Sequence, residues 1–102
     1  MFLSGQISIN PETNEFIDGD IERQTEQVLK NIKAILEAGN SSLENVVKVT
    51  IYLQDIKDFA SVNKIYSKYF EKSLPARACI EVSNLPKNAK LEIDAIAACH
   101  KY

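Results

Sequence analysis

The sequence predicts an α+β fold in the order β-α-β-α-β-β, with two helices packed on one face of a mixed sheet. Two amphipathic segments with apolar residues at helical spacing alternate with segments rich in β-branched residues. The 102 residues leave room for one domain, expected over residues 1–102. Because crossover helices return over the same sheet face, the other face of this sheet is expected to stay open.

The first strand is expected over Phe2–Ile9, where successive residues alternate between two faces. Asn10-Pro11 ends it, and a polar loop follows. Asp20 is a suitable N-cap for a first helix, and Gly39-Asn40 is a typical C-terminal stop. The second strand is expected over Val46–Leu53, which is rich in β-branched residues. Its core-facing residues are expected to be Val47, Val49, Ile51 and Leu53.

Asp58 is expected to cap a shorter second helix, which ends before Pro75. Two further strands are expected over Arg77–Val82 and Leu91–Cys99, joined by a polar turn as an antiparallel hairpin. In the first of them, alternation predicts that Ala78, Ile80 and Val82 face inward and that Arg77, Cys79 and Glu81 face the other way. In such a hairpin, Arg77 and Glu92 lie on adjacent strands and can reach one site.

The open sheet face is expected to be partly apolar. The residues assigned to it include Phe2, Val46, Tyr52, Ile96 and Ala98. An exposed apolar face of this size is typical of an oligomer interface, which predicts a homo-oligomer.

Composition excludes several classes of function. The net charge of -2 and the pI near 5.4 are unlike the basic footprint of a nucleic-acid-binding domain. One histidine, His100, and two cysteines are too few for a zinc site, and three glycines form no nucleotide-binding motif. No cofactor or metal is therefore expected. The chain has no apolar run long enough to span a membrane and no secretion signal, so no membrane association and a cytoplasmic location are expected.

Arg77 is the most informative candidate site residue. A guanidinium offers a planar pair of donors to a carboxylate or phosphate, which lysine cannot do. Arg77 lies in a strand between two alanines, which give it no cover. An arginine that pairs with a structural carboxylate, or one that faces solvent, remains an open alternative.

Glu92 is the second candidate, since it shares its strand face with Asp94, Ile96 and Ala98. A carboxylate in partly apolar surroundings has a raised pKa and can move protons near neutrality. The alternative is a solvated glutamate paired with Lys90 or Arg77.

Weaker candidates surround these two. Ser4-Gly5 in a strand allows a ligand to approach the backbone closely, although a bulge explains a strand glycine equally well. Cys79 shares the Arg77 face and is expected to be an unreactive thiol. Asn63 lies in the middle of the second helix, at the surface or in an interface.

Four segments together resemble the RidA/YjgF-type reactive-intermediate deaminases, a family with the older name L-PSP endoribonuclease. They are Phe2-Leu3-Ser4-Gly5-Gln6-Ile7, Phe59-Ala60-Ser61-Val62-Asn63, Pro75-Ala76-Arg77-Ala78-Cys79-Ile80-Glu81-Val82 and Leu91-Glu92-Ile93-Asp94-Ala95-Ile96-Ala97. The resemblance covers almost the whole chain. It implies a chorismate-mutase-like fold and a homotrimer with sites between subunits.

The resemblance also implies a chemistry, the hydrolysis of 2-iminobutanoate and 2-iminopropanoate to 2-oxo acids and ammonia without a cofactor. Arg77 would bind the substrate carboxylate, and Glu92 would hold or activate the attacking water. Backbone groups of Cys79 and Gly5 would line the site with Ser4 nearby, and Asn63 would approach from the neighbouring subunit.

The chain departs from the family pattern at its start. Relatives usually carry an upstream strand with a Gly-Pro-Tyr-Ser-like stretch, whose tyrosine lines the site, and this chain is expected to lack it. Two other functions stay open: a non-catalytic module of the same fold that binds 2-oxo acids or amino acids, and the endoribonuclease or translation inhibitor of the older family name. The negative net charge disfavours the last.

Overall fold

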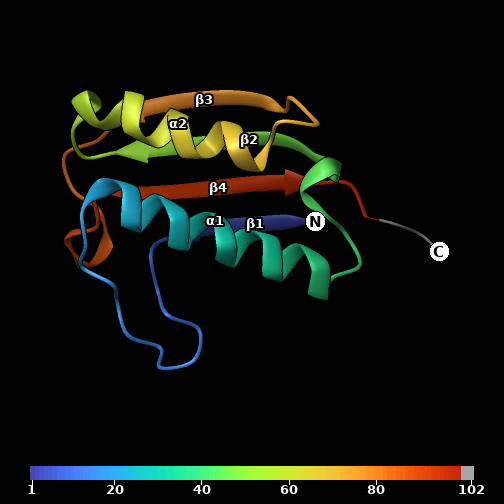
Figure 1. Cartoon of the computed structure of the whole chain (residues 1–102), viewed down its shortest axis with the longest axis horizontal. Helices are drawn as coiled ribbons and strands as arrows, with labels where there is room; N and C mark the ends of the chain where they lie inside the picture. Colours follow the sequence, from blue (N-terminus) through green and yellow to red (C-terminus); the bar gives the residue numbers. More distant parts are fainter. Residues whose placement is uncertain (100–102) are drawn as a thin grey trace.

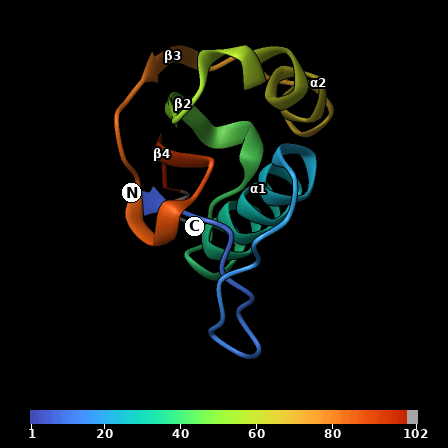
Figure 2. The same ribbon diagram turned by 90° about the vertical axis from the view of Figure 1, so that its left-hand side faces the viewer.

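A computed structural model describes residues 1–99, in which four strands form a single mixed sheet of order β1-β4-β2-β3. The strands are β1 (Phe2–Gln6), β2 (Val46–Leu53), β3 (Ala76–Glu81) and β4 (Leu91–Ala97). Helices α1 (Ile21–Ala38) and α2 (Phe59–Tyr69) lie side by side on one face of the sheet (Figures 1 and 2). The predicted α+β class, element order and one-sided helical layer are confirmed.

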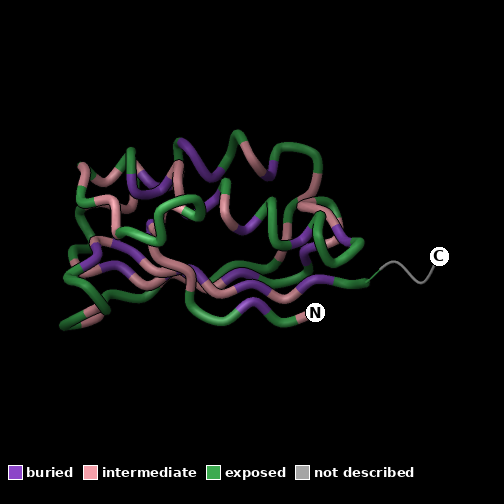
Figure 3. The backbone as a smooth tube through the Cα atoms, turned by 90° about the horizontal axis from the view of Figure 1, so that it is seen from below, coloured by how far each residue is buried: buried purple, intermediate pink, exposed green. Residues whose placement is uncertain are grey.

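The α1 helix begins and ends where the sequence predicts. The Asp20 carboxylate accepts a hydrogen bond from the Arg23 backbone N–H at 2.8 Å, which satisfies one free donor of the first turn. At the other end, the Gly39 N–H bonds back to the Leu36 carbonyl, and Asn40 adopts the left-handed conformation at φ 60°. The buried aliphatic residues of α1, Val28, Leu29, Ile32 and Leu36, belong to the same core cluster as the buried residues of the sheet. Figure 3 shows the buried positions along the helical layer and the strands.

The residue that caps the start of α2 is not the one predicted. Asp58 occupies the N-cap position, but its side chain makes no capping hydrogen bond. The carboxylate of Asp55 instead accepts from the Lys57 N–H at 2.9 Å and caps the short 3₁₀ turn Ile56–Asp58 that leads into the helix. The turn of 3₁₀ helix moves the capping position back by three residues.

The pattern predicted for β2 is wrong at its first two residues. An irregularity in the pairing with β4 between Val46 and Lys48 shifts the alternation of the strand. Val46 therefore enters the core at 4% exposure, while Val47, expected inside, is 55% exposed. From Val49 onward the alternation follows the prediction, with Val49, Ile51 and Leu53 buried.

The predicted hairpin of the last two strands is also wrong. β3 pairs in parallel with β2, whereas β4 lies between β1 and β2 and is antiparallel to both. Residues 82–90 carry the chain across β2, through a tight turn in which Lys87 and Asn88 both have positive φ. β4 also supplies the partner of β1, through the pairs Phe2–Ile96 and Leu3–Ala95.

The faces of β3 are the reverse of those predicted. In the parallel register, Arg77 pairs with Val49 and Cys79 with Ile51, so both project toward the helices. Ile80, expected inside, pairs with Tyr52 on the open face and is 48% exposed.

The sheet face opposite the helices is open, as predicted (Figure 3). It presents Phe2, which is 83% exposed, together with Tyr52, Ile80 and Ile96. Two residues assigned to it from the sequence do not belong there, since Val46 is buried in the core and Ala98 follows the end of β4. Within residues 1–99, neither helix is long and apolar enough to cross a membrane.

Candidate active site

The candidate residues of the sequence gather in two groups. The first is the arginine cluster, formed by Arg77 and Cys79 on β3 with Phe59, Asn63 and Tyr66 on α2. The edge position of β3 brings the Arg77 side chain to the flank of α2. There its guanidinium carbon lies 5.3 Å from the centre of the Phe59 ring and 4.9 Å from that of Tyr66.

These contacts hold the guanidinium without neutralising it. The Asn63 side-chain oxygen accepts a hydrogen bond from Arg77 Nη1, and the two rings offer favourable cation–π contacts. Arg77 nevertheless remains exposed, so N–H groups of its guanidinium are available to bind a carboxylate. Asn63 thus lies beside Arg77 of its own chain, which differs from the expectation that the neighbouring subunit supplies it.

Cys79 lies two residues along β3 from Arg77 and is half-buried. Burial raises the pKa of its thiol, and the positive charge of Arg77 offsets part of this effect. The thiol is therefore neutral near neutral pH, as expected from the sequence, and is a poor nucleophile.

A cavity of about 580 Å³ adjoins the arginine cluster on the side of the α2 C-terminus. Tyr66, Phe70, Leu74 and Pro75 supply its apolar walls, and its polar groups come from Arg77, Asn63, Ser67 and Glu71. Leu74 is 91% exposed. A cavity that combines apolar walls with convergent polar groups is the usual form of a small-molecule site.

The second group is the glutamate cluster, formed by Ser4, Gly5, Tyr52, Glu92 and Asp94 on the open face of the sheet. Glu92 pairs with Tyr52 across the β2–β4 ladder. Its carboxylate lies directly over Gly5, because a Cβ added to Gly5 would be 2.1 Å from Glu92 Oε2. The strand glycine is therefore needed for the close approach of the carboxylate.

The surroundings of Glu92 disfavour its ionised form, as its partly apolar neighbours on the strand predict. Burial raises the pKa of its carboxyl, and the negative charge of Asp94 raises it further. Neither cation named as an alternative partner pairs with it. The Lys90 ammonium donates to the Gly19 carbonyl at 3.3 Å, and Arg77 projects from the other face of the sheet.

The two clusters do not meet within one chain. β2 separates β3 from β4, which places their backbones about 10 Å apart. Arg77 projects toward the helices, whereas Glu92 projects from the open face. The expectation that adjacent strands bring both residues to one site in the same chain is therefore wrong.

Neither Phe59 nor Tyr66 was singled out from the sequence as a site residue, and their contact with Arg77 emerges from the structure. A signal was available, because Phe59, Asn63 and Tyr66 follow one another at intervals of four and three residues. That spacing places all three on one face of a helix.

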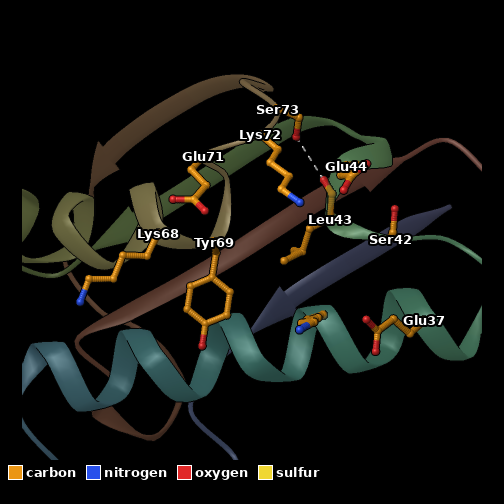
Figure 4. Close-up of a pocket in the computed structure, with 10 residues that line it drawn as sticks. Glu37, Ser42, Leu43, Glu44, Lys68, Tyr69, Glu71, Lys72 and Ser73 are labelled. Atoms are coloured by element: carbon orange, nitrogen blue, oxygen red, sulfur yellow. Dashed lines mark hydrogen bonds between the residues drawn. The ribbon is translucent and has the colours of Figure 1, made fainter.

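Another cavity, of about 240 Å³, lies between α1 and the segments that follow the two helices (Figure 4). Its lining mixes both signs of charge and includes Lys33, Glu37, Glu44, Lys68, Glu71 and Lys72. It contains neither Arg77 nor Glu92. Over residues 1–99, no group of three or more histidine, cysteine or acidic side chains is arranged to hold a metal ion.

Comparison with known proteins covers almost the whole chain. The family model described as Endoribonuclease L-PSP matches residues 1–99. A RutC family protein from Pyrococcus horikoshii is 57% identical over 97 residues, which are 95% of this chain and 77% of the relative.

Two further relatives carry names related to reactive intermediates or amino acids. The chloroplastic Reactive Intermediate Deaminase A of Arabidopsis thaliana is 50% identical over 95% of this chain and 52% of its own length. The crystal structure of TdcF from E. coli, with bound serine, has a TM-score of 0.90 and 39% identity, and the match covers 97% of this chain and 80% of that one.

Proposed function

The chain belongs to the RidA/YjgF family, whose model is described as Endoribonuclease L-PSP, and we propose that it hydrolyses reactive 2-imino acids to 2-oxo acids and ammonia. The proposed substrates are small ones such as 2-iminobutanoate and 2-iminopropanoate. No cofactor takes part in the proposed reaction. A protonated imine is already a strong electrophile, so a positioned water and a base suffice.

The observation that carries this proposal is the state of Arg77. Its guanidinium is fixed by Asn63 and two aromatic rings, carries no carboxylate partner among these contacts, and stays exposed beside a cavity. A substrate carboxylate would accept a pair of hydrogen bonds from this guanidinium in a bidentate arrangement. Such a charged hydrogen bond contributes about 1.5–3 kcal/mol, which is enough to orient a small ligand.

Glu92 supplies the proposed proton transfers. Water attacks the imine carbon, the C=N electron pair moves to nitrogen, and the Glu92 carboxylate takes a proton from the water. Glu92 then returns this proton to the nitrogen of the tetrahedral intermediate. The C–N bond breaks, ammonia leaves with the hydroxyl proton, and a 2-oxo acid remains. A carboxyl with a raised pKa suits a group that must both accept and return a proton.

We further propose that the active site forms between subunits of a homotrimer. The carboxylate and the imine carbon of a 2-imino acid are bonded neighbours, so Arg77 and Glu92 must approach each other closely. Within one chain they project from opposite faces of the sheet. The open apolar face, with Phe2 and Ile80 exposed, is suited to burial against other copies.

The proposed activity is tested by adding the purified protein to 2-iminobutanoate produced by a threonine dehydratase. We expect faster loss of the imine than in buffer, and a kcat/KM about 10- to 100-fold lower for R77A, from the lost charged hydrogen bond. R77K, which keeps the charge but not the fork, is expected to lie between the two. A wild-type rate equal to that of buffer alone contradicts the proposal.

A second candidate function is non-catalytic binding of amino acids or 2-oxo acids, and the serine bound in the related E. coli TdcF favours it. It requires Arg77 but not Glu92. Saturable binding of 2-oxobutanoate without acceleration of imine loss, unchanged in E92Q, would support this function over the first.

A further inference from the structure

Asp94 lies next to Glu92 in a fixed arrangement that the proposed reaction does not yet use. The two residues are separated by one position on β4 and project from the same face. Their Cα atoms are therefore about 7 Å apart. The Tyr52 hydroxyl donates a hydrogen bond to Asp94 Oδ2 at 3.0 Å. Since Tyr52 pairs with Glu92 across the ladder, its hydroxyl spans from one carboxylate toward the other.

Few other charges face Glu92 on the open face of the sheet. β1 has no ionisable side chain, and β3 presents only apolar residues on this side. Lys48 pairs with Ile96, on the far side of Asp94 from Glu92. The Met1 ammonium donates to the Ala97 carbonyl at the other end of β4. The Lys90 ammonium, two positions before Glu92 in the chain, donates to the Gly19 carbonyl at 3.3 Å. Within the described chain, Asp94 and Tyr52 are thus the ionisable groups that lie beside Glu92 on this face.

We propose that Asp94 is a positioning residue that keeps a negative charge beside Glu92 and so sets the pH range in which Glu92 transfers protons. The hydrogen bond from the Tyr52 hydroxyl holds the Asp94 carboxylate in this place. The proposal rests on the deaminase function given above. A fixed charge at this distance acts on the proton affinity of Glu92 without touching the substrate. The Tyr52 bond matters because an untethered aspartate would turn to solvent, where its effect is screened.

The sign of the effect follows from the charges. A neighbouring negative charge disfavours the ionised form of Glu92, in agreement with the contribution of Asp94 to the raised pKa of that carboxyl. The hydrogen bond to Asp94 and its negative charge likewise raise the pKa of the Tyr52 hydroxyl, which therefore remains a donor throughout the physiological range. Removing the charge of Asp94 lowers the pKa of Glu92.

The test is D94N, which removes the charge but keeps a side-chain oxygen that can accept from Tyr52. The Glu92 carboxyl is titrated by ¹³C NMR, and the pH profile of kcat/KM is measured on the same protein. We expect both the titration and the acid limb of the profile to move to lower pH, by about 0.5–1 unit. D18N, in the exposed loop before α1, makes the same change in net charge and is the matched control.

Y52F is a second variant, and it keeps the packing of the ring. Because this variant lacks the hydrogen bond to Asp94, we expect the Glu92 titration to move in the same direction as in D94N, but by less. The proposal is overturned if the Glu92 carboxyl titrates at the same pH in D94N as in D18N. It is also overturned if the titration moves in D94N but the acid limb of the kcat/KM profile does not. The NMR titration needs no activity. A wild-type protein that does not hydrolyse imines therefore removes the proposed function, and the titration alone then decides whether Asp94 acts on Glu92.

Discussion

Gly5 contributes to the candidate site at the scale of single residues, because its missing side chain leaves room for the Glu92 carboxyl. We expect G5A to reduce kcat/KM at least about 10-fold, since the added Cβ lies 2.1 Å from Glu92 Oε2 and displaces it. The obstructed atom is the end of a flexible side chain, so the free energy of unfolding should change by less than about 1 kcal/mol. Imine hydrolysis and urea unfolding measure the two effects.

A matched control exists for this substitution. In G19A, the added Cβ would meet Arg23 Cδ, which is again part of a flexible side chain, and neither Gly19 nor Arg23 belongs to either cluster. G19A should retain wild-type activity. If G5A were as active as G19A, the Glu92 carboxyl would not need its position over Gly5.

The raised pKa of Glu92 also predicts how stability depends on pH. A carboxyl whose pKa is higher in the folded than in the unfolded state favours folding most below its unfolded pKa, near 4.3, and that contribution is lost as the pH rises through the folded value. Ionised Glu92 therefore destabilises the protein at neutral pH. We expect E92Q to be more stable than wild type at pH 7, by up to about 1 kcal/mol because solvent screens the partly exposed carboxyl.

Urea unfolding at pH 7 and at pH 4 measures this effect. The advantage of E92Q should disappear at pH 4, where Glu92 is largely protonated in wild type as well. E12Q, in the exposed loop between β1 and α1, controls for the change in net charge. An E92Q protein that is less stable than wild type at pH 7 would show that the carboxylate is favourably paired.

At the scale of secondary-structure elements, the irregularity at the start of β2 decides which valine enters the core. We expect V46A to lower the free energy of unfolding by about 1–3 kcal/mol, because Val46 is buried. V47A should change it by less than about 0.5 kcal/mol, because Val47 is exposed. Urea unfolding of the two variants gives the order directly, and an unbroken alternation along Val46–Leu53 predicts the reverse.

The connection between β3 and β4 shows what element-level reasoning could have inferred. Residues 82–90 separate the two strands, and hairpin loops are usually two to five residues long. The length of this segment is thus a sign against a hairpin. The choice of β1 and β2 as the partners of β4 is a different matter, because it depends on contacts between residues far apart in the sequence.

At the scale of the whole molecule, the separation of the two clusters has a consequence that mixing of two impaired variants can test. R77A keeps Glu92, and E92Q keeps Arg77. If a site takes its arginine and its glutamate from different subunits, unfolding and refolding an equal mixture should recover about a quarter of the wild-type activity by random assortment. The imine assay and light scattering, which should report three times the chain mass of 11.5 kDa, measure the outcome.

The controls are each variant refolded alone, which should show no more than its own reduced activity. No recovery in a mixture that forms mixed oligomers would mean that both residues act from the same chain. That result would require a rearrangement of β3 relative to the sheet, since Arg77 and Glu92 project from opposite faces.

The α+β class, the order of the elements and most of their ends could be predicted from the sequence, because these depend on local spacing and local chemistry. Asp20 and Gly39-Asn40 end α1 through bonds to residues within four positions. Side-chain chemistry and position in a strand likewise made Arg77 and Glu92 the leading candidates, and the family resemblance then assigned each a role.

The pairing of the strands, and with it the sheet face that each candidate occupies, could not be predicted in this way. The pairing of β3 with β2 turns Arg77 toward the aromatic rings of α2, and the pairing of β4 with β1 brings Glu92 over Gly5. A strand with alternating residues fits a sheet with either face inward, and the choice between them follows from non-local packing energy. That choice separates the arginine and glutamate clusters in one chain, and no local pattern encodes it.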